Sequence, residues 1–588
     1  MKEVFRNIKH KADLCIVGGG LSGMCAAVAA ARHGIKVVLM HDRPVYGGNA
    51  SSEIRMWVCG AHGDNNRETG IIEEIALENL YRNPYRRYPM WDCILFELIN
   101  NEKNITSILN CSCNDIEMDG NKIKSITGWQ TTTQRFHTVE AEYFADCSGD
   151  SVLAPLSGAE YRMGREARSE FGESIAPETA DKKTMGMSCL IQARQTDKPH
   201  KYIAPEWARK FTKEDLPYRL PDMDDPEENF WYMELGGEQD AIGDTEEIRD
   251  ELIKVAYGIW DFVKNSGEYD ADNWELDFVG FLPGKRESRR YVGDHIMTQA
   301  DVSSGGRFDD VIAYGGWTMD DHDPAGINTR EKPNIFHPAP SPFGIPYRCI
   351  YSVNIDNLWF AGRNISVTHT AMSATRVMAT CALLGQAVGT AAAIAVRENE
   401  TPRGIYKNYI AELKQTLMDD DCWLPYDKME ISDLTKSAKL SSTGKNVYKL
   451  LNGVERRRGD EDNCWSGRVG DTITFTFEKE KLINEIRFVF NSDLNRETTG
   501  AGRFRKEKMS ICNVFLDNPA LNVPKTLVKD MMIELMDESG DFHKTDMIKN
   551  NHQRLVKRAV GKKAYGVRFT LLSTNGNEKT DIYSIDIR

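Results

Sequence analysis

The chain has 588 residues, and 41% of them are hydrophobic, so it is long enough for two to four domains with large cores. The formal net charge of −14 disfavours a nucleic-acid partner, whose phosphates it would repel. The 13 cysteines contain no CxxC pair, which favours reduced thiols and a cytoplasmic location over a disulfide framework. We find no metal-ligand spacing and expect no metal site.

The segment Asp13–Pro44 has the pattern of a βαβ unit. Leu14–Val17 is a short apolar run typical of a buried parallel strand, and an alanine-rich helix is predicted over Ser22–His33, ending at Gly34. A second strand is predicted over Ile35–Met40. The turn before the helix spells GxGxxG and predicts a pyrophosphate site at the helix N-terminus, formed by Gly18, Gly20, Leu21, Ser22 and Gly23.

An acid is expected at the end of the second strand, where it would bind ribose hydroxyls. Asp42 stands 19 residues after Gly23, close to the expected spacing, and is our candidate. His41 occupies the usual glutamate position and is a rival hydrogen-bonding group, and we add the adjoining Arg43 to the predicted cofactor contacts.

Two further segments have small residues suited to a cofactor. RPVYGGNASSEIR allows close backbone approach and offers small donors for the ribityl chain and the isoalloxazine edge, from Gly47, Gly48, Asn49, Ser51 and Ser52. The alternative is a glycine turn capped by Asn49 and Ser51. A later strand ending at Ala145–Gly149 predicts contacts from Ser148 and Gly149 with the adenosine half.

The region between residues 160 and 345 is expected to supply the substrate side. In LPGKRESRR, Arg286 and Arg290 are candidates for clamping an anionic group or assisting catalysis, and a structural salt-bridge network is the alternative. YGGWTMDDHDPAG surrounds His322 with three aspartates, which makes this histidine our first candidate for a catalytic base. His369 is the second candidate.

The segment Asn357–Ala393 predicts a late return of the chain to the cofactor. A strand over Leu358–Ala361 is followed by Gly362 and Arg363, and an N-cap at Ser373 or Thr370 would begin a small-residue helix. The helix end would stabilise negative charge on a reduced ring through Ser373, Ala374 and Thr375. The uncharged stretch Val377–Val396 is long enough for a membrane span, but its alanine-rich composition favours a buried helix.

Beyond residue 440 the pattern changes to alternating apolar and polar residues, which predicts an antiparallel β-sandwich. The predicted strands are Asp471–Glu478, Leu482–Asn491, Lys508–Leu516, Met531–Met536, Ala564–Leu571 and Ile582–Arg588. The run LLNGVERRRGDEDNCWSG and the final IYSIDIR resemble discoidin-like or galactose-binding-like modules. In such a module Trp465 would be a sugar platform, and a structural or dimerising sandwich is the alternative, which leaves homo-oligomer formation open.

Six segments together resemble one family of FAD-dependent oxidoreductases, related to the fumarate reductase and glutathione reductase flavoproteins and often associated with carbohydrate breakdown. They are VGGGLSGM, DRPVYGGNASSEIRMW, ADCSGD, LPGKRESRRYVGDHIMTQ, YGGWTMDDHDPAG and NLWFAGRNISVTHTAMSATRVMATCALLGQAVGTAA, within residues 10 to 440. The resemblance implies noncovalent FAD. It also implies an α/β Rossmann-like FAD-binding domain of the GR2 type over residues 1–160 and 346–440, a substrate region over 161–345 and the sandwich over 441–588.

The function expected from this resemblance is oxidation of a hydroxyl or C–H bond of a polar, carbohydrate-derived molecule by hydride transfer to flavin. One alternative is a reductase of unsaturated acids, in which Arg286 or Arg290 would donate the proton. Another is a noncatalytic carbohydrate-binding or assembly protein with a structural flavin. We find no second GxGxxG and no redox CxxC, which leaves the electron acceptor open.

Overall fold

Residues 5–63, 65–494 and 509–588 are described by the computed structural model, and the chain divides into two units. Unit 1 comprises Met1–His62, Tyr85–Lys414 and Lys508–Pro519, and unit 2 comprises Gly63–Pro84, Gln415–Glu507 and Ala520–Arg588. Each unit therefore contains a short segment that is distant in sequence from the rest of that unit. No sequence signal marked these two segments.

A seven-stranded sheet forms the centre of unit 1, in the order β3-β2-β1-β6-β5-β4, with β17 also paired to β6. The strands are β1 (Asn7–Val17), β2 (Val37–Met40), β3 (Ile105–Ile108), β4 (Cys111–Asp119), β5 (Lys122–Gln130), β6 (Arg135–Asp146) and β17 (Leu358–Phe360). β3, β2, β1, β6 and β17 run parallel, whereas β4 and β5 are antiparallel. The carboxyl ends of β1, β2, β6 and β17 therefore meet at one edge of the sheet. The four predicted strands in this region are confirmed.

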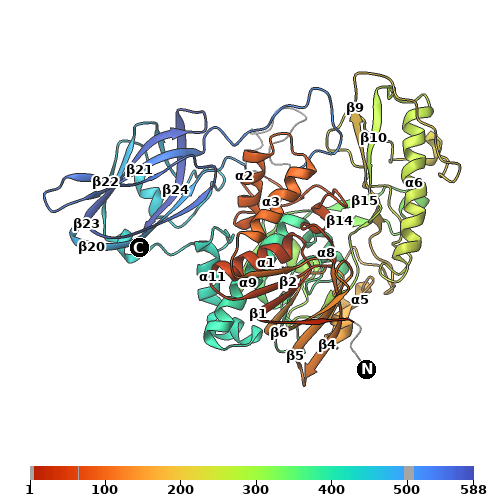
Figure 1. Ribbon diagram of the computed structural model, residues 1–588, viewed down its shortest axis with the longest axis horizontal. Helices are drawn as coiled ribbons and strands as arrows, with labels where there is room; N and C mark the ends of the chain where they lie inside the picture. The colour runs from red at the N-terminus through yellow and green to blue at the C-terminus, as the bar shows by residue number, and fades with distance from the viewer. Residues whose placement is uncertain (1–4, 64, 495–508) are drawn as a thin grey trace. The chain divides into compact units, whose positions relative to one another are not determined.

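Two apolar helices lie side by side against this sheet, α1 (Leu21–Arg32) and α9 (Met378–Glu398) (Figure 1). Their backbones approach closely, because a Cβ on Gly385 would lie 1.9 Å from the Ser22 carbonyl oxygen. Among the described residues, α9 alone is long and apolar enough to cross a membrane, and 89% of its most apolar window is buried. The prediction of a buried helix is confirmed.

The remaining elements of unit 1 surround this core. The helices are α3 (Tyr88–Asn100), α4 (Leu153–Ser157), α5 (Arg168–Phe171), α6 (Thr245–Asn265), α7 (Gln299–Ser303), α8 (His369–Thr375) and α10 (Pro402–Gly404), and α11 (Ile410–Asp419) leads into unit 2. Five short strand pairs are described between residues 161 and 346: β7 (Tyr161–Arg162) with β12 (Arg290–Tyr291), β8 (Met187–Ser188) with β11 (Gly284–Lys285), β9 (Ile191–Gln195) with β10 (Trp274–Val279), β13 (Val311–Gly315) with β16 (Phe343–Pro346), and β14 (Met319–His322) with β15 (Asn334–His337). In Figure 1, α6 runs beside β9 and β10.

Unit 2 contains α2 (Ile71–Arg82), α12 (Asp433–Lys436) and a sheet in which every described strand pair is antiparallel. The strands are β18 (Lys439–Ser442), β19 (Trp465–Arg468), β20 (Thr472–Phe490), β21 (Val528–Met536), β22 (Phe542–Ile548), β23 (Leu555–Thr574) and β24 (Lys579–Ile587). The two strands predicted over Asp471–Glu478 and Leu482–Asn491 are thus one continuous strand, β20. The predicted strand over Lys508–Leu516 is wrong for 509–516, which form bends and irregular backbone with one isolated bridge from Val514 to Arg194, and Lys508 lies outside the described residues.

This sheet bends over itself. Phe475 and Phe488 are 13 residues apart on β20, which is roughly 43 Å in an extended strand. The rings of both nevertheless lie against Phe569, with centroids 6.0 and 5.2 Å away. The two halves of β20 therefore face each other across one apolar core, as in the predicted sandwich.

The predicted platform role of Trp465 is wrong. Its side chain is fully buried, and the indole Nε1 donates to Ser442 Oγ at 2.7 Å. A Cβ on Gly467 would lie 2.0 Å from the indole ring. Trp465 is a core residue and has no face open to a sugar.

Candidate active site

A cavity of about 530 Å³ opens at the carboxyl ends of β1, β2, β6 and β17, and its volume is in the ordinary range for small-molecule sites. It lies wholly within unit 1. It brings together sixteen of the predicted site residues: Gly18, Gly20, Leu21, Ser22, His41, Asp42, Arg43, Gly47, Gly48, Asn49, Ser148, Gly149, Arg286, His322, Gly362 and Arg363.

The glycine turn between β1 and α1 is shaped to hold a diphosphate. Gly18 has a φ of 106°, which favours glycine, and a Cβ on Gly23 would lie 1.9 Å from the Gly18 carbonyl oxygen. Gly20 differs, because its Cβ would meet only Gly48 Cα at 3.8 Å and the space around it belongs to the cavity. The first turn of α1 begins here, so its free amides border the cavity, and a dinucleotide fits this turn.

His41 is buried and uses both ring nitrogens. The Gly19 amide donates to Nδ1 at 3.0 Å, and Nε2 lies 3.1 Å from the Val45 carbonyl oxygen. Since a carbonyl oxygen only accepts, Nε2 carries the proton. Asp42 has a side chain that is 60% exposed and lines the cavity. Asp42 Oδ1 lies 3.2 Å from His41 Nδ1, but of the two candidates for the ribose contact Asp42 is the one whose side chain is exposed.

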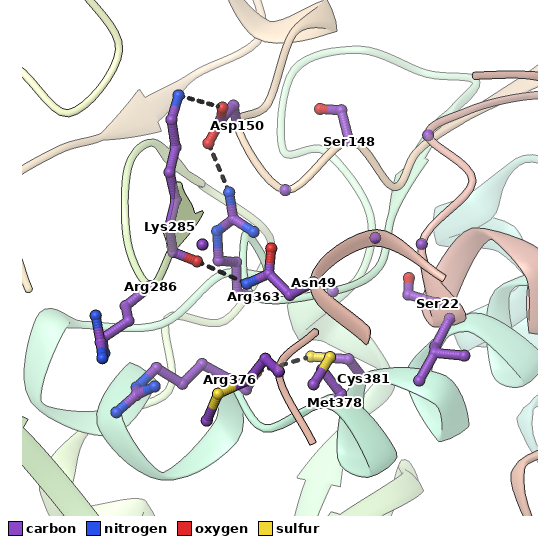
Figure 2. Close-up of a pocket in the computed structure, with 18 of the residues that line it drawn as sticks. Ser22, Asn49, Ser148, Asp150, Lys285, Arg286, Arg363, Arg376, Met378 and Cys381 are labelled. Carbon is purple, nitrogen blue, oxygen red and sulfur yellow. Dashed lines mark hydrogen bonds and ion pairs between the residues drawn. The ribbon is translucent and has the colours of Figure 1, made fainter. Parts of the chain in front are cut away.

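Two cations share one carboxylate in the middle of the cavity wall. Lys285 Nζ lies 2.9 Å and Arg363 Nη2 2.6 Å from the two oxygens of Asp150. Figure 2 shows both cations pointing toward Asp150. Burial raises the pKa of Asp150, but the charges of Arg363 and Lys285 outweigh this and lower it to about 2. Arg363 Nε is buried without a hydrogen-bond partner, so it is a donor available to a ligand.

At the substrate end, His322 lies between two carboxylates. Its Nδ1 is 3.0 Å from Glu234 Oε1, and its Nε2 is 3.2 Å from Asp320 Oδ2. Arg376 Nη2 lies 2.9 Å from the same Nε2 and 3.0 Å from Asp320 Oδ2. Burial raises the pKa of Asp320, but the charges of His322 and Arg376 hold it well below its ordinary value. A neutral His322 with its proton on Nδ1 donates to Glu234 and accepts from Arg376 at Nε2, whereas a proton on Nε2 would instead donate to Asp320.

Arg286 completes this end of the cavity. Its guanidinium is 3.1 Å from Glu234 Oε2 and donates to the carbonyl oxygens of Gly186 and Trp231 at 3.0 and 2.8 Å. Figure 2 shows the Arg286 and Arg376 side chains directed to the same side of the cavity. Two positive side chains, Arg286 and Arg376, thus face two negative ones, Glu234 and Asp320, and their charges sum to zero.

Eight predicted site residues do not line the cavity: Gly23, Ser51, Ser52, Arg290, His369, Ser373, Ala374 and Thr375. The predicted N-cap at Ser373 or Thr370 is wrong, because both residues lie inside α8, which is capped by Thr368. The helix end that borders the cavity is that of α9, through Arg376, Val377 and Met378.

Arg290 and His369 belong to a buried ionic network behind the cavity wall. Arg290 contacts Glu166 at 3.0 Å and Glu287 at 3.4 Å, and it is fully buried. His369 lies between Glu287 at 2.9 Å and Asp321 at 3.1 Å. Burial lowers the pKa of His369, but the two carboxylates outweigh this and raise it to about 10. His369 is a permanent cation at neutral pH and is unsuited to accept a proton.

Several residues that line the cavity, or that contact a lining residue, were not predicted as site residues. Glu234 precedes His322 by 88 positions in an irregular segment, so no local motif joins them. Arg376 and Asp150 directly follow predicted site residues, and that adjacency was the available signal. Four aromatic side chains also line the cavity: Trp57, Trp231, Trp317 and Phe336.

The parallel sheet, the glycine turn and the large cavity beyond it define a dinucleotide-binding enzyme of the α/β class. A family model described as FAD dependent oxidoreductase matches residues 13–417, and the chain belongs to this family. The cofactor is therefore FAD, and the protein is an FAD-dependent oxidoreductase. No curated protein matches the chain significantly.

Among solved structures, the family 32 carbohydrate-binding module of EndoD from Streptococcus pneumoniae is 15% identical, with a TM-score of 0.20. The alignment covers 27% of this chain and 99% of that module. The family 32 module of NanJ from C. perfringens, determined in complex with galactose, is 9% identical with a TM-score of 0.18, over 27% of this chain and 97% of that module.

Proposed function

We propose that the protein oxidises a secondary or primary alcohol of a neutral, polar, sugar-like molecule, with His322 as the base. The observation that carries the proposal is His322 itself, which lines the cavity together with Asp320 and Arg376, its two Nε2 contacts, while its Nδ1 is fixed on Glu234. Bound FAD supplies the acceptor for the hydride that leaves the carbinol carbon. The carbon then becomes a carbonyl, and the hydroxyl proton goes to His322 Nε2.

The neighbours of His322 suit both of its protonation states. Glu234 holds the neutral ring in the Nδ1–H form, so that the Nε2 lone pair is the acceptor. After the proton arrives, Asp320, at 3.2 Å from Nε2, is placed to pair with the imidazolium. In the free site Arg376 occupies the Nε2 lone pair, and a substrate hydroxyl would take its place.

The charge balance supports a neutral substrate. Arg286 and Arg376 are each paired with a carboxylate, Glu234 and Asp320 respectively, so neither of these two arginines is left unpaired for a substrate carboxylate. Aromatic faces in the same wall suit the apolar C–H faces of a sugar ring, and the buried Trp317 Nε1, which has no partner, could serve a hydroxyl oxygen.

The same balance disfavours a reductase of unsaturated acids. Such an enzyme needs free guanidinium groups for the substrate carboxylates, whereas Arg290 lies behind the wall and Arg286 is bonded to backbone carbonyls and Glu234.

The proposal also includes a glutathione-reductase-like arrangement of the FAD unit, supported by the late strand β17, which runs parallel to β6 and leads to Gly362.

The test is anaerobic reduction of the bound flavin. The FAD-loaded protein is mixed without oxygen with a panel of aldoses, polyols and deoxy sugars, and the loss of the yellow flavin absorbance is followed. We expect bleaching by at least one sugar or polyol. A His322→Asn variant keeps a donor toward Glu234 but lacks Nε2, and its reduction rate should fall by ~10²–10⁴-fold.

His295→Asn is the matched control, because His295 also pairs with an aspartate, Asp301 at 3.0 Å, but does not line the cavity. It should reduce flavin at the parental rate. Reduction of the His322→Asn variant at the parental rate would remove the base assignment. Reoxidation of chemically reduced flavin by fumarate, together with no bleaching by any alcohol, would favour the reductase instead.

A further inference from the structure

The inference concerns His41, the histidine at the end of β2 where the family resemblance leads one to expect an acid. Its ring is 3% exposed and packs directly on Gly19, since a Cβ on Gly19 would lie 2.7 Å from the ring. Its Nδ1 accepts the Gly19 amide and its Nε2 donates to the Val45 carbonyl oxygen. The ring therefore ties the glycine turn to the segment that follows β2.

The tie fixes the middle of the phosphate turn. Gly19 lies between Gly18 and Gly20, and its own carbonyl oxygen accepts the Gly47 amide at 2.9 Å. Both backbone groups of Gly19 are thus held, one by His41 and one by Gly47. Because the turn binds a diphosphate through its backbone, its geometry at Gly19 affects the affinity for FAD.

This arrangement requires a neutral imidazole. A proton on Nδ1 would place two donors against each other, the Nδ1–H and the Gly19 amide, which are 3.0 Å apart. An alternative acceptor lies close, because Asp42 Oδ1 is 3.2 Å from Nδ1. The imidazolium would pair with Asp42, and this would leave the Gly19 amide without an acceptor and engage the carboxylate that is our candidate for the ribose contact.

The other groups around His41 do not provide the same switch. Tyr46 stacks on the ring at 6.2 Å, and burial raises its pKa, so it stays neutral. Burial raises the pKa of the Cys111 thiol to about 11, and this residue meets His41 through its backbone amide. Arg43 is the neighbouring guanidinium, and its Nε lies 4.0 Å from Asp42 Oδ1. Burial also raises the pKa of Glu53, although Arg43 and His41 oppose this, and Glu53 is the neighbour that must be controlled for.

We propose that His41 is a positioning residue for FAD that makes cofactor retention depend on pH. The neutral ring accepts the Gly19 amide and forms no ion pair with Asp42, and the protonated ring releases the turn and forms an ion pair with Asp42, which already lies 3.2 Å from Nδ1. The loss of an acceptor for a buried amide corresponds to roughly a tenfold to hundredfold weaker binding of FAD.

The test measures binding and needs no substrate, so it is independent of the proposed oxidation. Flavin-free protein is titrated with FAD between about pH 8 and about pH 5.5, the range in which histidine gains a proton, and binding is followed by the quenching of FAD fluorescence. We expect the wild-type Kd to rise by at least about tenfold as the pH falls. Thermal melting of the flavin-free protein at each pH verifies that it stays folded.

Two variants separate His41 from its neighbour. In His41→Asn the amide oxygen takes the place of Nδ1 and accepts the Gly19 amide without titrating, so its Kd should stay constant across the pH range. Glu53→Gln should follow the wild-type curve. If His41→Asn does not fold or does not bind FAD at either pH, His41→Gln replaces it, and the wild-type and Glu53→Gln curves still decide. The proposal would be overturned if the wild-type Kd for FAD did not change with pH, or if the His41→Asn variant showed the full pH response. Loss of the pH response in Glu53→Gln would also overturn it.

Discussion

Replacing Asp150 by asparagine removes the carboxylate that Lys285 and Arg363 share in the cavity wall. The pKa of this carboxyl is lowered from 3.8 to about 2, because the two cations outweigh the effect of burial. Because the Asp150 side chain is only 29% exposed, screening by solvent leaves most of this interaction in place. The shift corresponds to about 2 kcal/mol of folding free energy at neutral pH.

The sign of the pH dependence follows from the lowered pKa. Asp150 binds its proton less tightly in the folded protein, so its contribution is complete above about pH 4 and disappears as the pH falls through about 2. The flavin-free Asp150→Asn variant should therefore melt a few degrees below wild type, and this difference should be the same from about pH 7 to about pH 5.

Asp309→Asn is the matched control, because Asp309 also faces an arginine, Arg348 at 3.6 Å, but is 78% exposed. Its melting temperature should stay within about a degree of wild type, since exposed pairs contribute little. The reasoning would be refuted if Asp150→Asn melted like wild type at pH 7. It would also fail if the difference decayed between pH 7 and pH 5, because a group with a higher pKa would then be responsible.

Three glycine and tryptophan variants extend these tests. Gly20→Ala should leave the melting temperature of the flavin-free protein unchanged but weaken FAD binding, because its methyl group would meet only Gly48 Cα at 3.8 Å and would occupy cavity space. Gly23→Ala should lower the melting temperature as well, because its methyl group would lie 1.9 Å from the Gly18 carbonyl oxygen. A Gly20→Ala protein that binds FAD as wild type does would contradict the proposed course of the diphosphate. Trp465→Ala should lower the free energy of unfolding, measured by chemical denaturation, by about 3–5 kcal/mol. An unchanged denaturation midpoint would contradict the burial of Trp465 in the core.

The first nucleotide unit could be predicted from sequence because its determinants are local. The apolar strand, the glycine spacing and the alanine helix that ends at Gly34 are adjacent in the chain, and the structure has β1, α1 and β2 in those places. The helix start at Met378 was missed because polar residues at Thr370 and Ser373 imitate an N-cap, whereas the α9 N-cap is Val377, whose side chain makes no capping hydrogen bond. Trp465 was misassigned because composition does not report which tryptophans are buried.

The substrate end shows why the rest required a structure. Asp320 and Asp321 are neighbours on β14, and successive side chains of a strand point to opposite faces. Asp320 and His322 therefore share the cavity side with Arg376, whereas Asp321 meets His369 on the other side. Two histidines that each contact two carboxylates, His322 on β14 and His369 on α8, thus lie in different surroundings.

The two histidines differ in whether an arginine contacts Nε2: Arg376 contacts this atom in His322. His369 has a carboxylate at each ring nitrogen and, among the described residues, no arginine bonded to either, and the two carboxylates raise its pKa to about 10, so it remains a buried cation. His322 has Arg376 as well as Asp320 at Nε2, and the guanidinium favours a lone pair there over a proton. The base that we propose, His322, therefore depends on a contact with Arg376, which lies 54 residues away in sequence.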